Sequence, residues 1–358
     1  MARSITVTTP QSEYDIIIDA GWIDAQKINE IIQNRKYLIV TDENVYSHYG
    51  DLLKSFECLV LPVGEGTKSL KYFEKVIDLL QDKQFNRSSV LIAFGGGVIG
   101  DLTGYVAASY MRGIHFVQIP TTLLAMVDSS VGGKVAINHT SAKNLIGAFY
   151  QPEAVYMDVN FLKTLTQKVL SDGMAEVIKY GLGFDPKLFS KLEALNLDKL
   201  SSPEHQEAVL DIVETCCRIK AQIVHEDERD VAVRQLLNLG HTIGHAIEQF
   251  YQYKKYTHGQ AIAIGMVVKS RIAFFEKRID QQAIERIEKL FEQYHLPLEL
   301  EEPKMFSTLL EAIHLDKKST GAHIKWICVD AIGKCRIEGV QFEEIAQKIK
   351  NMNRECDL

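Results

Sequence analysis

The feature that most restricts how this chain can fold is a run of apolar, strand-type residues leading directly into three glycines. Val90–Phe94 has the composition of a buried strand, Gly95–Gly97 follow it, and the small residues that come next have a helical pattern. Glycines let a backbone approach phosphate groups, and the N–H groups and dipole of the following helix favour an anion. The segment predicts a turn that cradles a pyrophosphate. Its GGGxxGD spacing differs from GxGxxG, however, and such a turn can also be purely structural.

Downstream of a second expected strand, polar residues gather around another glycine pair. Gly132-Gly133 is surrounded by the polar and charged residues Asp128, Lys134, Asn138, Lys143 and Asn144. So many polar side chains in a glycine-rich segment indicate a surface that faces a ligand.

Short apolar strands alternate with helical patterns up to about residue 158. The expected strands are Tyr14–Ile18, Tyr37–Val40, Cys58–Val63, Val90–Phe94, His115–Ile119 and Ala154–Met157. This alternation predicts an α/β domain with a mainly parallel, Rossmann-like sheet. Ligands of such sheets bind beyond the carboxyl ends of the strands. We expect Asp42, Asn44, Glu65 and Lys68 to share that rim with the triple glycine.

After residue 158 the helical period dominates, so we expect domains at 1–159 and 160–358, the second mostly α-helical. The expected helices are Lys168–Leu182, Pro203–Glu226, Arg234–Tyr251, Gly259–Lys277, Gln282–Tyr294, Met305–Leu315 and Phe342–Asn351. A short β pair is expected at His323–Val329 and Lys334–Glu338.

Charge and composition exclude several classes of protein. The net charge of −7 argues against a broad nucleic-acid surface, and no apolar run approaches the roughly 18 residues that span a bilayer. The N-terminus lacks the apolar stretch of a secretory signal. The six cysteines have no CxxC spacing, which favours free thiols in a reducing cytoplasm.

Four residues of the helical half have the chemistry of metal ligands. His241 and His245 stand four apart and share a helical face, His258 opens the next helix, and Glu176 lies in an apolar segment. One glutamate and two of these histidines would suit a catalytic zinc-like ion, and the remaining histidine could handle protons. The spacing leaves open which histidine that is.

Cationic residues are spread along the chain, and each alone would ordinarily be a solvated surface charge. They are Lys134, Lys143, Lys179, Lys220, Arg234, Lys317 and Lys318. In the expected helix, Arg234, Asn238 and His241 would lie on one face. A site that gathers these cations would bind a small molecule with phosphate and carboxylate groups.

Several long motifs together resemble the 3-dehydroquinate synthase family, within the sugar phosphate cyclases. They are GGGVIGDLTGYVAASYMRG, QIPTTLLAMVDSSVGGKVAIN, KNLIGAFYQP, AEVIKYG, LNLGHTIGHAIE, HGQAIAIGM and the DKK near residue 316. The resemblance implies an N-terminal NAD-binding α/β domain, a C-terminal metal- and substrate-binding helical domain with the active site between them, and one zinc or cobalt ion.

Carried over position by position, the resemblance implies that Glu176, His241 and His258 bind the metal and that His245 is an active-site residue. The implied substrate contacts are Lys134, Asn144, Lys179, Lys220, Arg234, Asn238 and Lys317, which we prefer to Lys318. The implied NAD-binding positions are Asp42, Asn44, Glu65, Lys68, Gly97, Val98, Ile99, Gly100, Asp101, Thr121, Thr122, Asp128, Lys134, Lys143, Phe161, Leu162, Lys163 and Thr164. Arg112 matches an arginine that the family offers to the phosphate in the neighbouring subunit of a homodimer.

The activity implied by the resemblance is that of a carbon–oxygen lyase of the shikimate pathway. It would convert 3-deoxy-D-arabino-heptulosonate 7-phosphate to 3-dehydroquinate and phosphate. The implied route is transient oxidation by NAD+, phosphate elimination, re-reduction, ring opening and aldol closure. The alternatives are another sugar phosphate cyclase, such as a 2-deoxy-scyllo-inosose synthase, a metal-dependent alcohol or glycerol dehydrogenase, and a catalytically silent binding module. We expect a cytoplasmic enzyme with no nucleic-acid or membrane partner.

Overall fold

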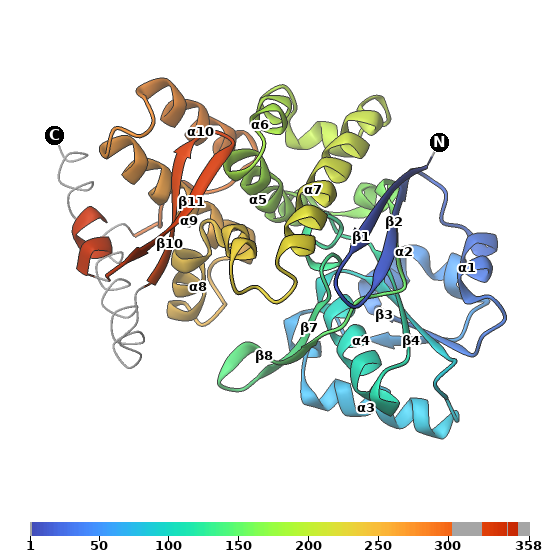
Figure 1. Ribbon diagram of the computed structural model, residues 1–358. Coiled ribbons are helices and arrows are strands. Elements are labelled where there is room, and N and C mark those ends of the chain that lie inside the picture. The colour runs from blue at the N-terminus through green and yellow to red at the C-terminus, as the bar shows by residue number, and fades with distance from the viewer. Residues whose placement is uncertain (1, 303–323, 342, 350–358) are drawn as a thin grey trace. The chain divides into compact units, whose positions relative to one another are not determined.

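The computed structural model describes residues 2–302, 324–341 and 343–349 (Figure 1). The expected helix Met305–Leu315 and the candidate residues Lys317 and Lys318 lie outside these ranges. Within the described ranges, no helix is both long enough and apolar enough to cross a membrane. Five cysteines fall within them, and all five are free thiols.

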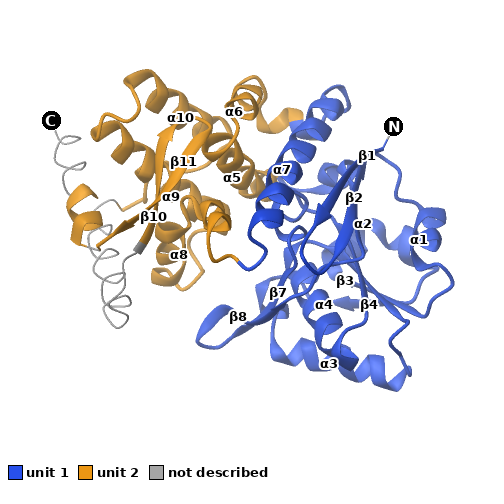
Figure 2. Cartoon of the chain, in the orientation of Figure 1, with its two compact units in different colours: residues 1–166, 200–229 blue, residues 167–199, 230–358 orange. Residues whose placement is uncertain are grey.

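The chain divides into two compact units (Figure 2). The first contains residues 1–166 and 200–229, and the second contains residues 167–199 and 230–358. A segment that we had grouped with the helical half therefore packs with the first unit. Compact units need not coincide with functional domains, so the boundary expected at residue 159 stays a prediction.

The first unit is built on a seven-stranded sheet. Its strands, in spatial order, are β1 (Arg3–Thr8), β2 (Glu13–Asp19), β9 (Ala154–Asp158), β6 (His115–Pro120), β5 (Val90–Gly95), β3 (Tyr37–Asp42) and β4 (Cys58–Leu61). All neighbours pair in parallel except β1 and β2, which are antiparallel. The mainly parallel sheet is thus confirmed, with β1 as an edge strand that we had not predicted.

The helices of the first unit are α1 (Ala25–Ile32), α2 (Glu43–Leu53), α3 (Leu70–Asp82), α4 (Gly97–Ser109) and α7 (Gln206–Glu226). Two of them, α1 and α2, begin at a capping aspartate. In α1, the side chain of Asp24 accepts a hydrogen bond from Lys27 N, and Ile28, Ile31 and Ile32 are buried. Side-chain caps of this kind satisfy backbone donors that a helix leaves unpaired at its start.

The strand order changes direction between β3 and β5. From β3 the chain continues to β4 at one edge of the sheet, whereas from β5 it continues to β6 on the other side. Ligands of open parallel sheets bind beyond the carboxyl ends of the strands at such a switch point. Asp42 ends β3 and Gly95 ends β5, so the expected rim lies at this point.

The polar segment after Gly132-Gly133 forms an antiparallel hairpin, which the sequence had not indicated. Its strands are β7 (Lys134–His139) and β8 (Ala142–Phe149). Val135 and Ile137 on alternate positions of β7 are buried in the core beside α4, while most of β8 is exposed. The hairpin therefore has one anchored strand and one strand available to solvent.

The second unit is mostly helical, as expected. Its main helices are α5 (Gln167–Gly183), α6 (Pro186–Glu193), α8 (His241–Phe250), α9 (His258–Phe275) and α10 (Gln281–Gln293), and residues 343–349 are also helical. The expected β pair is confirmed as the antiparallel hairpin of β10 (Ile324–Ala331) and β11 (Lys334–Val340). α6 was not predicted.

The expectation of one continuous helix over Arg234–Tyr251 is wrong. Val233–Asn238 is a short 3₁₀ helix, Leu239 lies in a turn with a non-helical ψ of 124°, and α8 begins only after Gly240. Gly240 has a φ of 83°, a left-handed conformation that favours glycine and interrupts a helix. Arg234 and Asn238 therefore do not share a helical face with His241.

Candidate active site

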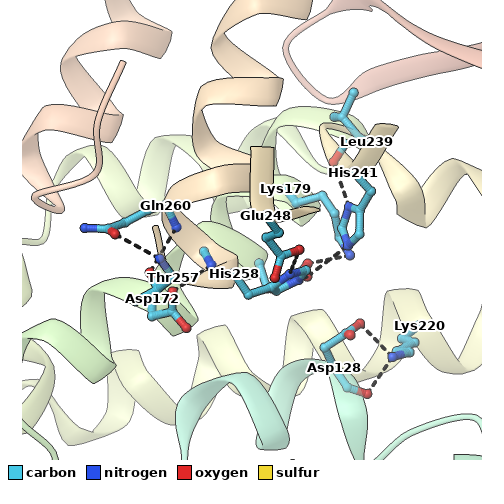
Figure 3. A network of polar contacts seen from close by, with 12 residues as sticks. Asp128, Asp172, Lys179, Lys220, Leu239, His241, Glu248, Thr257, His258 and Gln260 are labelled. Atoms are coloured by element: carbon cyan, nitrogen blue, oxygen red, sulfur yellow. Dashed lines mark hydrogen bonds and ion pairs between the residues drawn. The ribbon is translucent and has the colours of Figure 1, made fainter. Parts of the chain in front are cut away.

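Three helices of the second unit bring their ligand-type residues to one place. Glu176 lies within α5, His241 is the first residue of α8, and His258 is the first residue of α9. The start of α9 is fixed by a reciprocal cap, in which Thr257 and Gln260 bond each other's backbone N–H groups (Figure 3). α5 contributes to the same start, because Asp172 accepts a hydrogen bond of 2.6 Å from Gly259 N.

Close packing of α8 against α9 also depends on glycine. A Cβ added at Gly265 would lie 2.1 Å from the carbonyl oxygen of Gly240, so no side chain fits there. This close approach packs the start of α8 against the third turn of α9, and the contact of Gly244 with Ile262 shows that the two helices run antiparallel.

The side chains of Glu176, His241 and His258 converge on a common point. Glu176 Oε1 lies 3.4 Å from His241 Nε2 and 3.4 Å from His258 Nε2. One ligand atom from each of the three residues lies within 4.8 Å of the others. One carboxylate and two imidazoles form a ligand set that zinc or a similar ion accepts, with room for a substrate oxygen. The donor set thus fits a divalent metal.

Each imidazole has a hydrogen-bond acceptor on its other nitrogen. His241 Nδ1 lies 3.2 Å from the carbonyl oxygen of Leu239, and His258 Nδ1 lies 3.3 Å from Glu248 Oε2 (Figure 3). An acceptor at Nδ1 keeps the proton on that nitrogen, which leaves the Nε2 lone pair for a metal. Both rings therefore present Nε2 toward Glu176, which is the orientation that a shared metal would require.

Lys179 supplies positive charge beside this cluster. Its Nζ lies 2.5 Å from Glu176 Oε2, and both side chains are 1% exposed. Burial alone would raise the pKa of the Glu176 carboxyl, but the Lys179 ammonium and the His241 and His258 rings hold it well below its usual range. The glutamate therefore stays ionised, which is the form that binds a metal.

The ring of His258 is strongly influenced by the two carboxylates around it. Burial would lower the pKa of His258, but its hydrogen bonds to Glu176 and Glu248 raise it to about 10. The same negative charge that holds a proton here would favour a divalent cation in its place.

His245 and Glu248 lie beside the cluster. His245 is exposed, and its ring centroid lies 5.3 Å from that of His241 and 6.1 Å from that of His258. His245, Glu248 and His258 also offer ligand atoms within 4.8 Å of one another. We had missed Glu248 in the sequence, although it follows His241 by seven residues and so shares its helical face.

The remaining substrate candidates of the second unit lie on the 3₁₀ segment before α8. Arg234 is 2% exposed, and Asn238 ends the segment and is half-buried.

In the first unit, the triple glycine forms the turn from β5 into α4. Gly96 caps α4 without any side-chain hydrogen bond, and Gly97, Val98, Ile99 and Gly100 form the first turn. A Cβ at Gly95 would lie 2.8 Å from the Cβ of Ile99, so the strand and helix can join this closely only through glycine. A helix start without a capping side chain leaves N–H groups for an anion.

The strands on either side of β5 are β3 and β6, and the candidate residues that follow these two strands come next to the glycine turn in the order of the sheet. Asp42 caps α2 through Val45 N, and Asn44 is exposed in the first turn of that helix. Thr121 N donates to Gly95 O, and Thr122 Oγ1 accepts from Ala125 N. The buried hydroxyl of Thr121 has no hydrogen-bond partner within the part of the chain that the structure describes. A bound ligand could supply that partner.

Two polar contacts connect the β4–α3 loop to its surroundings. Lys68, which follows the short 3₁₀ helix Glu65–Thr67, forms an ion pair with Asp101 of α4. Burial raises the pKa of the Asp101 carboxyl, and the neighbouring ammonium of Lys68 opposes that rise. Glu65 Oε1 accepts a hydrogen bond of 2.7 Å from Asn138 of the β7–β8 hairpin. The expected cofactor residues Glu65, Lys68 and Asp101 thus lie in one connected region.

Lys220 and Asp128 form a separate pair. Lys220 of α7 is 5% exposed, and its Nζ lies 2.6 Å from Asp128 Oδ1. Asp128 belongs to a short π-helical turn, Ala125–Ser129, and its backbone carbonyl accepts from the same ammonium. Both candidates therefore come together although 92 residues separate them.

The β7–β8 hairpin and the turn after α4 contain the more exposed of the candidate substrate- and cofactor-binding residues. Lys134 begins β7 and is exposed, Lys143 is half-buried on β8, and Asn144 is exposed on β8 with a φ of 54°. Arg112 is exposed and has a φ of 67°, within the turn Tyr110–Arg112.

The segment Val159–Thr164 is a 3₁₀ helix whose side chains mostly serve the core. Phe161 and Leu162 are buried, and the Phe161 ring contacts those of Tyr49 and Phe94. Thr164 Oγ1 is 2.9 Å from the Tyr49 hydroxyl, and Lys163 is exposed. If Phe161 and Leu162 contact a cofactor, their backbone is the part available to do so.

Comparison with protein families matches most of the chain. The family described as 3-dehydroquinate synthase N-terminal matches residues 58–172, and the 3-dehydroquinate synthase C-terminal family matches residues 173–319. A 3-dehydroquinate synthase from Clostridium botulinum is 41% identical over 351 residues, covering 95% of this chain and 99% of that protein. One from Colwellia psychrerythraea is 42% identical over 346 residues, covering 95% and 97% respectively.

Solved structures with the same fold are more distant in sequence. A 2-epi-5-epi-valiolone synthase from Streptomyces hygroscopicus with NAD+ and Zn2+ bound has a TM-score of 0.85 at 24% identity, covering 97% of this chain and 99% of that one. A 2-deoxy-scyllo-inosose synthase complexed with carbaglucose-6-phosphate, NAD+ and Co2+ has a TM-score of 0.82 at 23% identity, covering 98% and 100%. An iron-containing alcohol dehydrogenase from Thermococcus thioreducens has a TM-score of 0.68 at 16% identity, covering 97% and 99%. These likenesses establish the fold.

Proposed function

This chain belongs to the 3-dehydroquinate synthase family, and from that premise we propose how its residues carry out the family's reaction. The reaction converts 3-deoxy-D-arabino-heptulosonate 7-phosphate to 3-dehydroquinate and phosphate. The observation that carries the proposal is the approach of Glu176 Oε1 to within 3.4 Å of both His241 Nε2 and His258 Nε2. The relatives at about 40% identity are dehydroquinate synthases, whereas the cyclases and dehydrogenase compared above are less than 25% identical.

We assign Glu176, His241 and His258 as ligands of one divalent ion, with zinc and cobalt both suited to this donor set. When bound, such an ion is a Lewis acid that makes a substrate hydroxyl proton easier to remove. The chain supports this role by holding both imidazoles through Nδ1 and by keeping Glu176 ionised beside Lys179.

We assign NAD+ to the switch point of the sheet, at the β5–α4 turn. When bound, NAD+ accepts a hydride and later returns it, so the reaction has no net redox change. The uncapped start of α4, the close β5–α4 turn and the unpartnered Thr121 hydroxyl support this assignment. Lys68, Glu65 and Asp101 would fix the loop beside the cofactor.

The side chains of this protein would bind the substrate and handle its protons. Lys179 would attract the ionising substrate hydroxyl, because its buried ammonium acts in surroundings that screen charge poorly. His245 would hold or release a proton, since its exposed ring is close to both proposed histidine ligands. Lys220 and Arg234 are nearly fully buried cations suited to the phosphate and carboxylate groups.

We further propose a cytoplasmic homodimer in which Arg112 reaches the phosphate bound by the other subunit. The exposed left-handed turn Tyr110–Arg112 supports this part of the proposal, because strained backbone often accompanies functional contacts. Sedimentation of the purified chain would test the assembly, and the KM of Arg112→Ala for the heptulosonate phosphate would test the residue.

The central experiment follows free phosphate and the carbocyclic product after the protein is mixed with the heptulosonate phosphate, NAD+ and zinc. We expect both products, no net NADH, loss of activity after chelation, and recovery with zinc or cobalt. His258→Ala should abolish this recovery, while His48→Ala, at an exposed histidine of the first unit, should not. Full activity after complete metal removal would contradict the proposal. Net NADH from a simple polyol would instead favour a dehydrogenase.

A further inference from the structure

Glu248 is a buried carboxylate that the proposed reaction does not yet use. It lies on α8, is 4% exposed, and follows His241 by seven residues. Burying a carboxylate is unfavourable unless charged or hydrogen-bonding groups compensate for its lost hydration. One such group is the imidazole of His258, whose Nδ1 lies 3.3 Å from Glu248 Oε2 (Figure 3).

The two proposed histidine ligands have the same arrangement but different partners. In each, Nε2 lies 3.4 Å from Glu176 Oε1, and Nδ1 faces an acceptor on the opposite side of the ring. The acceptor for His241 is the backbone carbonyl of Leu239, which no substitution of that side chain removes. The acceptor for His258 is a side chain, so the orientation of this ligand depends on one residue.

We propose that Glu248 is a positioning residue, which orients His258 and fixes its tautomer so that Nε2 is presented to the metal. The inference rests on the proposed function, because it assumes that Glu176, His241 and His258 hold the ion. Carboxylates that accept the second N–H of a metal-bound histidine typically change metal affinity by about 10- to 100-fold when removed.

Another arrangement of the same residues has to be distinguished from this one. Glu248, His245 and His258 also have ligand atoms within 4.8 Å, so Glu248 could itself be a ligand. Both sets require His258, and a neutral imidazole has only one lone pair to donate. The Glu176 set has both rings oriented through Nδ1, whereas the other set would require Glu248 to leave its orienting role. The geometry therefore favours Glu248 as the partner of a ligand.

The test compares Glu248→Gln with Glu248→Leu, using the full chain and Co2+ as the probe. Glutamine keeps an oxygen acceptor at nearly the same place, whereas leucine has none. Affinity is measured by competition with a chromogenic chelator, and the ligand set by the visible absorption of bound Co2+. We expect Glu248→Leu to weaken Co2+ binding about 10- to 100-fold. Glu248→Gln should recover most of that loss, with the absorption of the unaltered protein.

The outcomes separate the inference from the function on which it rests. Unchanged Co2+ affinity in both variants would overturn the positioning role while leaving the metal site intact. Equal losses in both variants, with altered Co2+ absorption, would identify Glu248 as a ligand and also overturn it. If the unaltered protein binds no Co2+, both the proposed function and the inference fail.

A control for general destabilisation comes from the same unit. Asp280 caps α10 by accepting a hydrogen bond from Ala283 N, and it is exposed. Asp280→Ala should lower the Tm without changing Co2+ affinity. If Asp280→Ala weakened Co2+ binding as much as Glu248→Leu, the affinity loss would reflect stability and the inference would be rejected.

Discussion

Two lysines of the second unit are equally buried but have different surroundings. Lys179 on α5 and Lys269 on α9 are each 1% exposed. Lys179 Nζ lies 2.5 Å from Glu176 Oε2, whereas Lys269 Nζ donates to the carbonyl of Ile327 at 2.9 Å and lies 3.2 Å from the ring centroid of Trp326. Burial lowers the pKa of Lys269 to about 7, so this lysine readily loses its charge.

Burial of a lysine therefore does not by itself indicate a functional site. Two further buried lysines, Lys68 and Lys220, resemble Lys179 because each pairs with a carboxylate. A carboxylate partner offsets much of the cost of desolvating an ammonium, and such pairs keep charge where a ligand can use it. A carbonyl and an aromatic ring offset less of this desolvation cost. We therefore interpret Lys269 as a structural residue that packs against β10 of the β10–β11 hairpin.

The largest effect on activity should come from replacing Glu176, the acidic partner of Lys179. Glu176→Gln would deprive the proposed metal of its only carboxylate ligand and leave the Lys179 ammonium without its charge partner. We expect phosphate release to fall by about a thousandfold or more, since a metal Lewis acid contributes several kcal/mol. Metal content measured after dialysis should fall as well.

The matched control for this substitution is Glu193→Gln. Glu193 forms an ion pair with Arg286 at 2.7 Å, but the pair is partly exposed and lies outside the metal-type groups. Its loss should leave activity and metal content unchanged. Full metal content in Glu176→Gln would show that this carboxylate is not a ligand.

Much of this site could be predicted from the sequence, for identifiable reasons. The apolar run before Gly95 and the nearly continuous apolar stretch of α9 each reflect an element that is buried on most sides, which leaves a direct pattern in the sequence. The single helix expected over Arg234–Tyr251 was wrong because apolar spacing does not reveal a backbone change at Gly240. The β7–β8 hairpin was missed because only one of its strands has a clear buried alternation.

Side-chain orientation was the least predictable feature. Spacing placed His241 and His245 on one face, but it could not specify that His245 is exposed while the Nε2 of His241 faces Glu176. Glu248 has the right spacing from His241, yet its role depends on the start of α9, which is distant in sequence. Contacts between helices decide these roles, and no local pattern encodes them.

Replacing Lys179 tests whether its ion pair with Glu176 stabilises the fold, in contrast to Lys269, which faces a carbonyl and an aromatic ring. Lys179→Met leaves Glu176 buried without an ammonium, and loss of one partner of a buried pair costs about 3–5 kcal/mol. We expect a loss of this size in urea unfolding of metal-free protein. The loss should be smaller with saturating zinc, because the cation would then face the same carboxylate. An equal loss with and without zinc would contradict a metal at Glu176.

Replacing Lys269 by an apolar residue should raise the free energy of unfolding, whereas replacing Lys179 lowers it, and the gain should depend on pH. The pKa of Lys269 is about 7 in the folded protein against 10.5 ordinarily, so between these values the unfolded chain binds more protons. The destabilisation by Lys269 is therefore full below about pH 7 and disappears as the pH rises toward 10.5. The nearby Cys328 and Cys335 thiols favour the charged form, and Arg278 opposes it.

We accordingly expect Lys269→Met to stabilise the protein by about 1–3 kcal/mol at pH 7. The gain should be smaller at about pH 9, and the rate of phosphate release should not change. Urea unfolding at the two pH values is the measurement, and Lys269→Arg, which keeps a charge, is the matched variant that should destabilise at both. Destabilisation by methionine at pH 7 would mean that the Trp326 and Ile327 contacts outweigh the cost of burying the amine.

The smallest expected effect concerns a different buried polar group, the hydroxyl of Thr121, which lacks a hydrogen-bond partner within the described residues. Within the described residues, the hydroxyls of Thr121 and Thr103 are both buried and lack hydrogen bonds, but only Thr121 is assigned to NAD+. An unpaired buried hydroxyl costs about 1–3 kcal/mol, so valine at either position should raise the Tm of the cofactor-free protein. Thr121→Val should also weaken NAD+ binding by up to about tenfold, the loss of one neutral hydrogen bond, whereas Thr103→Val should not. Calorimetric titration with NAD+ distinguishes the two. If Thr121→Val bound NAD+ as tightly as the unaltered protein, the Thr121 hydroxyl would not contact NAD+. It would then resemble Lys269, a buried polar group that the reaction does not use.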